Sequence, residues 1–252
     1  MITKEQILKS ITLSKHAYSE RSEIPWKELG FDSVRWIQDR PTDTQGFVAT
    51  LGSDIFVVWR GSESPTDFLK DASVLKVKAF DNCKVHSGFH SCLTAVQDRL
   101  EADLKQVIQE IGGPYEVSRV YVSGHSLGGA LATLSAVQIS IWFPSLSPRL
   151  KVITAGSPRV GNRAFKTLFS KQVSECVRVV HDNDIVTRVP KLNYFHVGTQ
   201  LKLSDNGQVM TNNLNVLKHF ARATKANLTA NSFQDHRVGN YLSALNKWDG
   251  SL

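Results

Sequence analysis

Residues 120–130 read VYVSGHSLGGA, and this stretch decides the fold. The apolar, β-branched run at 117–122 predicts a buried strand, and the small-residue, leucine-rich run at 130–141 predicts a buried helix. Glycines two positions before and after Ser126 let strand and helix approach at a sharp turn without Cβ clashes. The Ser126 hydroxyl then projects at a helix N-terminus, where N–H groups lacking helical partners favour negative charge. Ser126 is therefore the candidate nucleophile of an acyl transfer.

Length and composition favour one large α/β core. The 252 residues are 41% hydrophobic, and no linker, internal repeat or low-complexity tract divides them. We expect a single domain over residues 1–252. The net charge of +7 comes from basic residues that are scattered, without a Lys/Arg run. No signature of nucleic-acid binding is present, so we expect no nucleic-acid partner.

The cysteines and histidines do not indicate a metal or a disulfide framework. Three cysteines are an odd number, and they lack CxxC spacing. His86 and His90 have the spacing of two ligands on one helix face, but Gly88 lies between them and no acidic third ligand is near. We expect no metal and no cofactor.

The chain shows no targeting or membrane segment. Its first residues lack the uninterrupted apolar run of a signal peptide, and polar side chains interrupt the longest apolar stretch, 130–143. We therefore expect no transmembrane segment and either a cytoplasmic protein or one secreted by a route without an N-terminal signal peptide. Removal of a leader stays open, and the oligomeric state is not readable from the sequence.

Strands and helices alternate along the rest of the chain. Residues 46–50 and 55–59 flank turn-forming residues and predict a β-hairpin. Further strands are expected at 151–155, 176–180 and 194–203, and helices at 4–18, 65–72, 163–169, 213–226 and 235–246, with a long helix ending near 111. This alternation predicts a mostly parallel central sheet flanked by helices.

A serine nucleophile needs an imidazole base, and the imidazole needs a carboxylate that holds its tautomer. In a fold with this strand-turn-helix serine, the acid and then the base follow the nucleophile along the chain. Asp182 and Asp184 both stand at the end of a predicted strand downstream of Ser126. Both remain candidates for the acid on this argument.

Three later histidines compete for the role of base. His196 falls inside a strand pattern, and His219 falls inside a helix pattern where a packed or surface histidine is expected. His236 follows an aspartate and opens a helix, so it lies at a loop-to-helix junction that can reach over the end of the sheet. We choose His236 as the base.

Six collinear stretches resemble one protein family: WRGS at 59–62, DFLKD at 67–71, VHSGF at 85–89, GHSLGGA at 124–130, TAGSPRVGN at 154–162 and NDIV at 183–186. They resemble the class 3 lipases, an α/β-hydrolase family that includes fungal triacylglycerol lipases, feruloyl esterases and many bacterial and plant lipases. With His236 the resemblance covers most of the chain from residue 46. It implies the α/β-hydrolase fold, with a short lid helix at 64–72.

The resemblance also assigns the site. It implies that Ser126 is the nucleophile, that Asp184 is the acid of the two candidates, and that His236 is the base. The oxyanion hole would consist of the backbone N–H and hydroxyl of Ser62 and the backbone N–H of Leu127.

Two neighbouring features stand apart from this assignment. His125 is not expected to be a triad member, because its side chain should point away from the nucleophile. The family usually continues its acid motif with Val-Pro and then Leu-Pro-Pro, whereas this chain has VTRVP at 186–190. That departure bears on the specificity for acyl group or alcohol and leaves the triad intact.

The implied activity is hydrolysis of carboxylic esters, namely acylglycerols or related lipid esters, through an acyl-enzyme. A phospholipase or a feruloyl-type esterase would use the same triad, because the choice of ester depends on pocket shape. A non-catalytic lipid-binding scaffold is the contrasting class, and the complete set of site residues argues against it. The expected partner is a lipid or small ester substrate, and the resemblance allows transient contact with a lipid interface.

Overall fold

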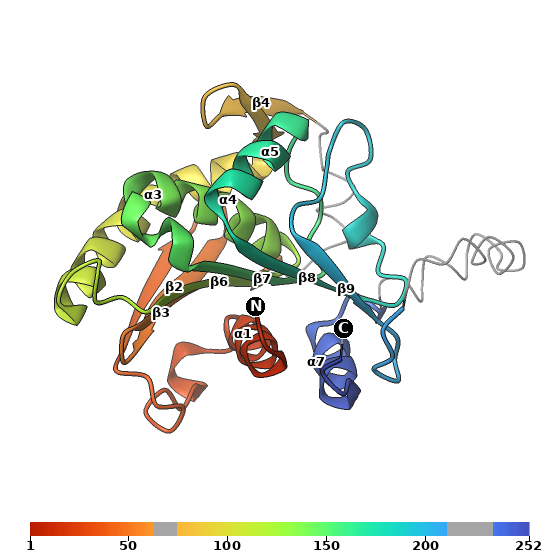
Figure 1. The fold of residues 1–252 in the computed structure, drawn as a ribbon, viewed down its shortest axis with the longest axis horizontal. Helices are drawn as coiled ribbons and strands as arrows, with labels where there is room; N and C mark the ends of the chain where they lie inside the picture. The colour runs from red at the N-terminus through yellow and green to blue at the C-terminus, as the bar shows by residue number, and fades with distance from the viewer. Residues whose placement is uncertain (63–74, 211–233, 252) are drawn as a thin grey trace, which may run out of the picture.

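The computed structural model describes residues 1–62, 75–210 and 234–251. A seven-stranded sheet with the order β1-β2-β3-β6-β7-β8-β9 forms its centre (Figure 1). The strands are β1 (Ser33–Asp39), β2 (Thr44–Leu51), β3 (Asp54–Trp59), β6 (Arg119–His125), β7 (Leu150–Ala155), β8 (Glu175–His181) and β9 (Thr199–Leu203). A separate two-stranded sheet pairs β4 (Lys76–Ala79) with β5 (Cys83–His86).

Strand directions confirm the prediction of a mostly parallel sheet. β1, β2 and β3 pair antiparallel, and the two-residue turn between Leu51 and Asp54 closes the predicted hairpin. From β3 to β9 every neighbouring pair is parallel. The carboxyl ends of these parallel strands meet at one edge of the sheet, which is where such sheets bind ligands. β6 has a parallel neighbour on each side, so the residue that follows it lies near the middle of that edge.

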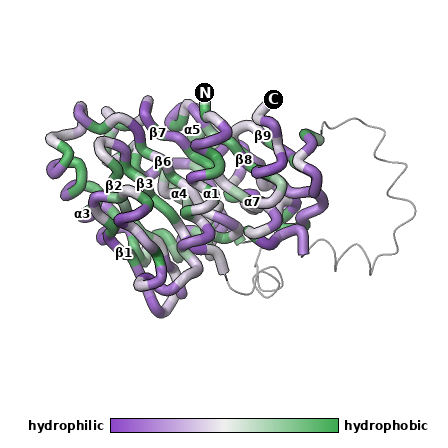
Figure 2. Tube along the Cα trace, turned by 90° about the horizontal axis from the view of Figure 1, so that it is seen from below, coloured by the Kyte–Doolittle hydropathy of each residue, from purple (hydrophilic) through white to green (hydrophobic). Residues whose placement is uncertain are grey.

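Helices cover both faces of the sheet (Figure 1). They are α1 (Lys4–His16), α3 (Ser87–Ile111), α4 (Leu127–Trp142), α5 (Arg163–Gln172) and α7 (Val238–Lys247), with short 3-10 turns η1 (Arg21–Glu23), η2 (Pro144–Arg149) and η3 (Val186–Arg188). α3, α4 and α5 pack on one face, and α1 and α7 pack on the other. Hydrophobic residues concentrate along the strands between these two layers (Figure 2). This burial of both faces explains why the parallel strands are apolar almost throughout.

The elements differ from the sequence predictions most clearly at β1, β9 and the two outer helices. The helix predicted at 235–246 begins at Val238, so His236 precedes it. β1 was not predicted, because this edge strand is only half buried and carries charged Arg35. The strand predicted at 194–203 begins at Thr199, because Gly198 has φ +64 and interrupts the extended chain. α1 ends at His16, which leaves Tyr18 beyond the helix.

Several predictions lie outside the described residues. The lid helix at 64–72, the helix at 213–226 and His219 fall in the two stretches that the structure does not describe. The single-domain prediction over residues 1–252 stays a prediction. Within the described ranges, no helix is both long and apolar enough to cross a membrane.

Candidate active site

Ser126 sits on the turn between β6 and α4 with φ 58 and ψ −127, a region that residues with side chains rarely adopt. The two glycines around it are required, as the sequence predicts. A Cβ on Gly124 would lie 2.2 Å from the carbonyl oxygen of Gly128, and a Cβ on Gly128 would lie 2.2 Å from that of Trp59. The Ser126 N–H donates to Ala155 O on the next strand at 2.9 Å, which fixes the turn to the sheet.

The structure brings Ser126, His236 and Asp184 together. His236 Nε2 lies 2.7 Å from Ser126 Oγ, and His236 Nδ1 lies 2.7 Å from Asp184 Oδ2. Because a carboxylate only accepts, Nδ1 carries the proton, and Nε2 is the nitrogen that accepts the serine hydroxyl. All three side chains are buried, with 1%, 3% and 0% of the surface of Ser126, His236 and Asp184 exposed.

The competing candidates have other partners. Asp182 accepts a hydrogen bond from the side-chain amide of Asn183 at 3.2 Å. His196 donates from Nε2 to Thr187 O at 2.7 Å, outside any strand. Burial lowers the pKa of His196 to about 3, so it is neutral. Neither residue is hydrogen-bonded to the Ser126 and His236 pair.

Tyr241 supports Asp184, the candidate acid, and was missed as a site residue by the sequence analysis. Its hydroxyl donates to Asp184 Oδ2 at 2.5 Å, while the N–H of Val186 donates to Asp184 Oδ1 at 2.8 Å. Burial, and then the neighbouring Asp184 carboxylate, raise the pKa of Tyr241 well above its usual value, so the phenol stays protonated and donates. The sequence offered only an inward-facing tyrosine on the helix after His236, which is also what core packing looks like.

The segment that follows β3 passes directly against the nucleophile. A Cβ on Gly61 would lie 3.0 Å from Ser126 Cβ and 2.1 Å from the hydroxyl oxygen of Tyr18. Ser62 follows Gly61, so this contact brings it close to Ser126. Leu127 directly follows Ser126 and is the first residue of α4. Their assignment to an oxyanion hole is taken up as a proposal below.

His125 contacts His236 rather than Ser126. Its Nε2 donates to the carbonyl oxygen of His236 at 2.7 Å, and the Tyr18 hydroxyl lies 2.9 Å from its Nδ1. Burial lowers the pKa of His125 well below its usual value, and the nearby His236 lowers it further. No sequence pattern indicates that Tyr18, 107 residues earlier, reaches this position.

Gly156 makes room for the acid and the base. It has φ +61, and a Cβ there would lie 2.9 Å from His236 Cε1 and 3.0 Å from Asp184 Oδ2. A side chain at this position would therefore push the imidazole out of line. The residue belongs to the TAGSPRVGN stretch, for which the sequence analysis named no role.

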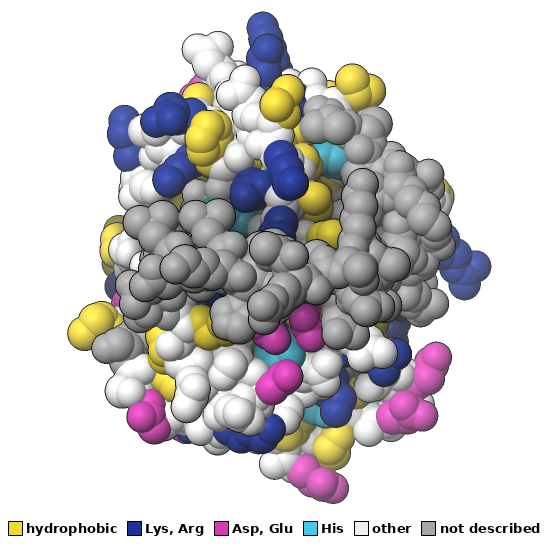
Figure 3. Space-filling model, turned by 90° about the vertical axis from the view of Figure 1, so that its right-hand side faces the viewer, with side chains coloured by type: hydrophobic (Ala, Val, Ile, Leu, Met, Phe, Trp, Pro, Cys, Tyr) yellow, Lys and Arg dark blue, Asp and Glu magenta, His cyan; other side chains and the backbone are white. Residues whose placement is uncertain are grey.

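One face of the molecule is uneven in charge. On the face seen in Figure 3, Lys and Arg side chains gather in the upper half, and Asp and Glu lie mainly in the lower half around a histidine. Within the described residues, no group of three or more His, Cys, Asp and Glu side chains is arranged to hold a metal ion.

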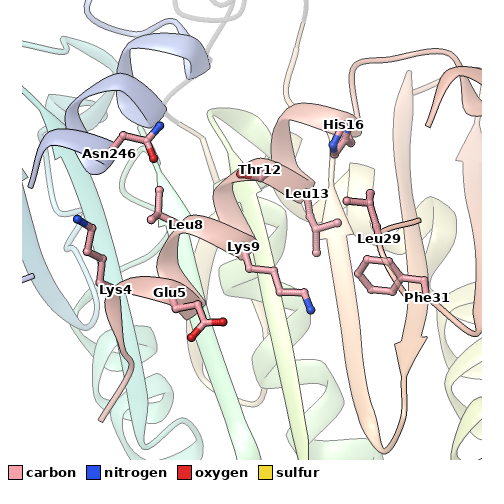
Figure 4. A pocket seen from close by; sticks show the side chains of 10 residues that line it. All are labelled: Lys4, Glu5, Leu8, Lys9, Thr12, Leu13, His16, Leu29, Phe31 and Asn246. Atoms are coloured by element: carbon pink, nitrogen blue, oxygen red, sulfur yellow. The ribbon is translucent and has the colours of Figure 1, made fainter. Parts of the chain in front are cut away.

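A groove of about 550 Å³ runs along the outside of α1 (Figure 4). Leu8, Leu13, Leu29 and Phe31 are among its lining side chains, and none of the lining residues belongs to the cluster around Ser126. The groove is therefore separate from the hydrogen-bonded cluster of Ser126, His236 and Asp184.

Two of the curated relatives that match the sequence are named for different lipids. Secreted mono- and diacylglycerol lipase A of Penicillium cyclopium is 32% identical over 184 residues, covering 70% of this chain and 58% of the relative. The chloroplastic phospholipase A(1) DAD1 of Arabidopsis thaliana is 39% identical over 110 residues, covering 42% of this chain and 24% of the relative. The chain thus spans between a quarter and three fifths of the length of these relatives.

The prediction of a cytoplasmic protein, or of one secreted without an N-terminal signal peptide, is wrong. The Penicillium relative is named as a secreted lipase. The prediction rested on the first residues of the chain. These do not decide the compartment, because a secretory leader is removed from the mature protein and leaves no mark on the fold.

The fold is the α/β-hydrolase fold of the fungal lipases. A triacylglycerol lipase whose catalytic centre is formed by a serine protease triad superposes with a TM-score of 0.75 at 26% identity, covering 92% of both chains. The family model for lipase (class 3) matches residues 56–194, which include the serine turn and Asp184. This chain belongs to the class 3 lipase family.

Proposed function

We propose that this protein is a serine-dependent carboxylic ester hydrolase that acts on lipid esters through an acyl-enzyme. The observation that carries the proposal is the chain of two 2.7 Å hydrogen bonds from Ser126 through His236 to Asp184. This is the arrangement that activates an otherwise inert hydroxyl.

The proposed reaction has two halves. Ser126 Oγ attacks the ester carbonyl while His236 Nε2 takes its proton, and the resulting imidazolium is stabilised by Asp184. The proton then passes from Nε2 to the leaving alkoxide, so an alcohol departs and the acyl group stays on Oγ. Water repeats the sequence: it loses a proton to Nε2, attacks the acyl-enzyme, and releases the carboxylic acid while Oγ regains the proton. No cofactor takes part in these steps.

We assign the oxyanion hole to the backbone N–H groups of Ser62 and Leu127 and the hydroxyl of Ser62. Two features support the assignment. Leu127 is the first residue of α4, where the N–H has no helical acceptor. The backbone at Gly61 touches the nucleophile, which brings the next residue to the side where the oxyanion forms.

The names of the relatives support acylglycerols as the substrates of this protein. One relative is named a mono- and diacylglycerol lipase, and the superposed structure is a triacylglycerol lipase. A phospholipase is the second candidate, because the Arabidopsis relative is named a phospholipase A(1). A feruloyl-type esterase rests on the family resemblance alone. A lipid-binding scaffold without catalysis would not need the aligned triad.

A series of p-nitrophenyl esters of increasing acyl length, run beside Ser126→Ala, tests the proposal. We expect the wild type to hydrolyse the series and the variant to lose about a millionfold in kcat. Monoolein and phosphatidylcholine, offered separately, then distinguish the two lipid classes. The nucleophile assignment fails if Ser126→Ala, with unchanged circular dichroism, keeps even a tenth of the wild-type rate.

A further inference from the structure

The main chain on both sides of the proposed base is held by histidines. The carbonyl oxygen of His236 accepts a hydrogen bond from His125 Nε2 at 2.7 Å, and the carbonyl oxygen of Asp235 accepts one from His181 Nδ1 at 3.1 Å. These two carbonyls belong to the peptide units on either side of the His236 Cα. The triad mechanism uses neither His125 nor His181.

Both histidines are rigidly placed. His125 is the last residue of β6 and His181 is the last residue of β8, two strands separated only by β7. They are 4% and 1% exposed. The base lies just before α7, outside the sheet, so these two donors attach its backbone to the carboxyl edge of the parallel strands.

The carbonyl oxygen of His236 fixes the tautomer of His125. Its Nε2 must carry a proton, because a carbonyl oxygen only accepts, and the Tyr18 hydroxyl then donates to Nδ1. Burial keeps this ring neutral by lowering its pKa well below the usual value. Neutrality matters here, since the ring centroids of His125 and His236 are 4.6 Å apart, and a second positive charge would oppose the imidazolium formed during catalysis.

His181 meets an acceptor at each nitrogen. Nδ1 faces the carbonyl oxygen of Asp235, and Nε2 lies 3.0 Å from Asp205 Oδ1. Because a carbonyl oxygen only accepts, Nδ1 is the donor in the bond to Asp235. The Tyr241 ring lies 5.6 Å from the ring of His181 and 5.8 Å from that of His125, which links these two donors to the residue that supports Asp184.

We propose that His125 and His181 are positioning residues that fix the main chain at Asp235 and His236, so that the His236 imidazole stays in line with Ser126. The proposal rests on the proposed function, since it concerns the same triad. Its physical basis is that a misplacement of about 1 Å in a catalytic group costs on the order of a hundredfold in rate.

Substitution of each histidine by Asn and by Gln distinguishes a role as hydrogen-bond donor from a role in packing. The Asn amide nitrogen is bonded to Cγ, as His Nδ1 is, and the Gln amide nitrogen lies one atom further out, near the position of His Nε2. His125→Gln and His181→Asn therefore keep the donor to the main chain. His125→Asn and His181→Gln lose it.

We expect kcat for a short p-nitrophenyl ester to fall about a hundredfold in the two variants that lose the donor, with KM nearly unchanged. The two variants that keep the donor should stay within about tenfold of wild type, since a neutral amide still makes the bond. A packing role predicts that Gln, which is closer to His in volume, is better tolerated at both positions. At position 181 the two explanations predict opposite orders, and an activity of His181→Gln equal to or above that of His181→Asn would overturn the proposal.

A matched control is available on α3. His90 contacts Thr94 one turn along the same helix, and His90→Asn should leave kcat unchanged. If the wild type shows no Ser126-dependent hydrolysis, the proposed function has failed. If that hydrolysis is present and the order at position 181 is wrong, only the positioning proposal has failed.

The outer partners test the same idea without touching the buried histidines. Asp205 is 73% exposed, so Asp205→Ala poses little risk to folding. Tyr18→Phe keeps the ring and removes the hydroxyl that donates to His125 Nδ1. We expect each to lower kcat by roughly tenfold at constant KM, in proportion to the loss of one hydrogen bond to a positioning group. Wild-type kcat in both variants would contradict the proposal even if the histidine variants fail to fold.

Discussion

The serine and the histidine of the site are held in opposite ways. The serine turn is local: Gly124 and Gly128 lie within two residues of Ser126, and their missing side chains create its geometry. The base is assembled from a distance, with Asp184 lying 52 residues before His236 and His125 lying 111 residues before it. The geometry of the serine therefore depends mainly on five consecutive residues. The position of the histidine depends on residues that only folding brings together.

The strongest test of the distant half is Asp184→Asn. An amide in place of the carboxylate no longer stabilises the charged imidazole and favours the wrong tautomer, so we expect kcat to fall about ten-thousandfold. Steady-state kinetics on a soluble ester measures it. Asp182→Asn is the matched control and should stay close to wild type. An equal loss at both positions would mean that the acid is misassigned.

Ser62→Ala tests whether a residue distant in sequence from the serine turn stabilises the oxyanion that forms at Ser126. The hydroxyl should bind the oxyanion more strongly than the ground-state carbonyl, so we expect kcat to drop by roughly ten- to a thousandfold with little change in KM. The backbone N–H survives the substitution. An effect on KM alone would instead place Ser62 in ordinary substrate binding.

A pair of glycine substitutions compares the surroundings of His236 with the serine turn directly. In Gly156→Ala the new Cβ would lie 2.9 Å from His236 Cε1, and we expect kcat per folded molecule to fall about a hundredfold. In Gly128→Ala the new Cβ meets the backbone of Trp59 at 2.2 Å, so we expect the melting temperature and the yield of folded protein to fall first. Near-ultraviolet circular dichroism counts the folded molecules. A Gly156→Ala enzyme with wild-type kcat would refute the tight fit around the base.

The smallest expected effect is that of Tyr241→Phe. The ring and its packing remain, while Asp184 loses one donor and keeps the Val186 N–H. One hydrogen bond to a buried carboxylate is worth about 1.5–3 kcal/mol at most. Part of this free energy stabilises the enzyme–substrate complex and the transition state equally and does not affect kcat. We therefore expect kcat to fall by roughly tenfold. The same kinetic assay measures it, with Tyr115→Phe on the exposed surface as control.

This comparison also explains what the sequence predicted. The serine turn, the hairpin and the parallel strands depend on neighbours in sequence or on simple periodicity, and the structure confirms them. The choice of Asp184 needed a family resemblance, because Asp182 stands at the same strand end. The contacts of Tyr18, His125 and Tyr241 had no local signature, since helical or strand spacing assigns a side chain to a face without naming its partner.

The edge strand β1 was missed for a related reason. Its side chains are half buried, and Arg35 faces Glu110 of α3 at 2.6 Å, so its pattern lacks the apolar run that marked the central strands. Edge strands carry charge because it protects the open edge, and the same charge hides them from a search for hydrophobic periodicity.

The two histidine donors on the main chain of the base have a consequence for enzyme design. A designer who transplants a serine triad usually copies three side chains and asks a new scaffold to hold them. Here His236 would arrive without the two histidines that donate to the carbonyl oxygens of Asp235 and His236, because those donors stand at the ends of β6 and β8. A graft of this site would include these two donors as well, so that the scaffold reproduces the backbone position of the histidine together with the three side chains.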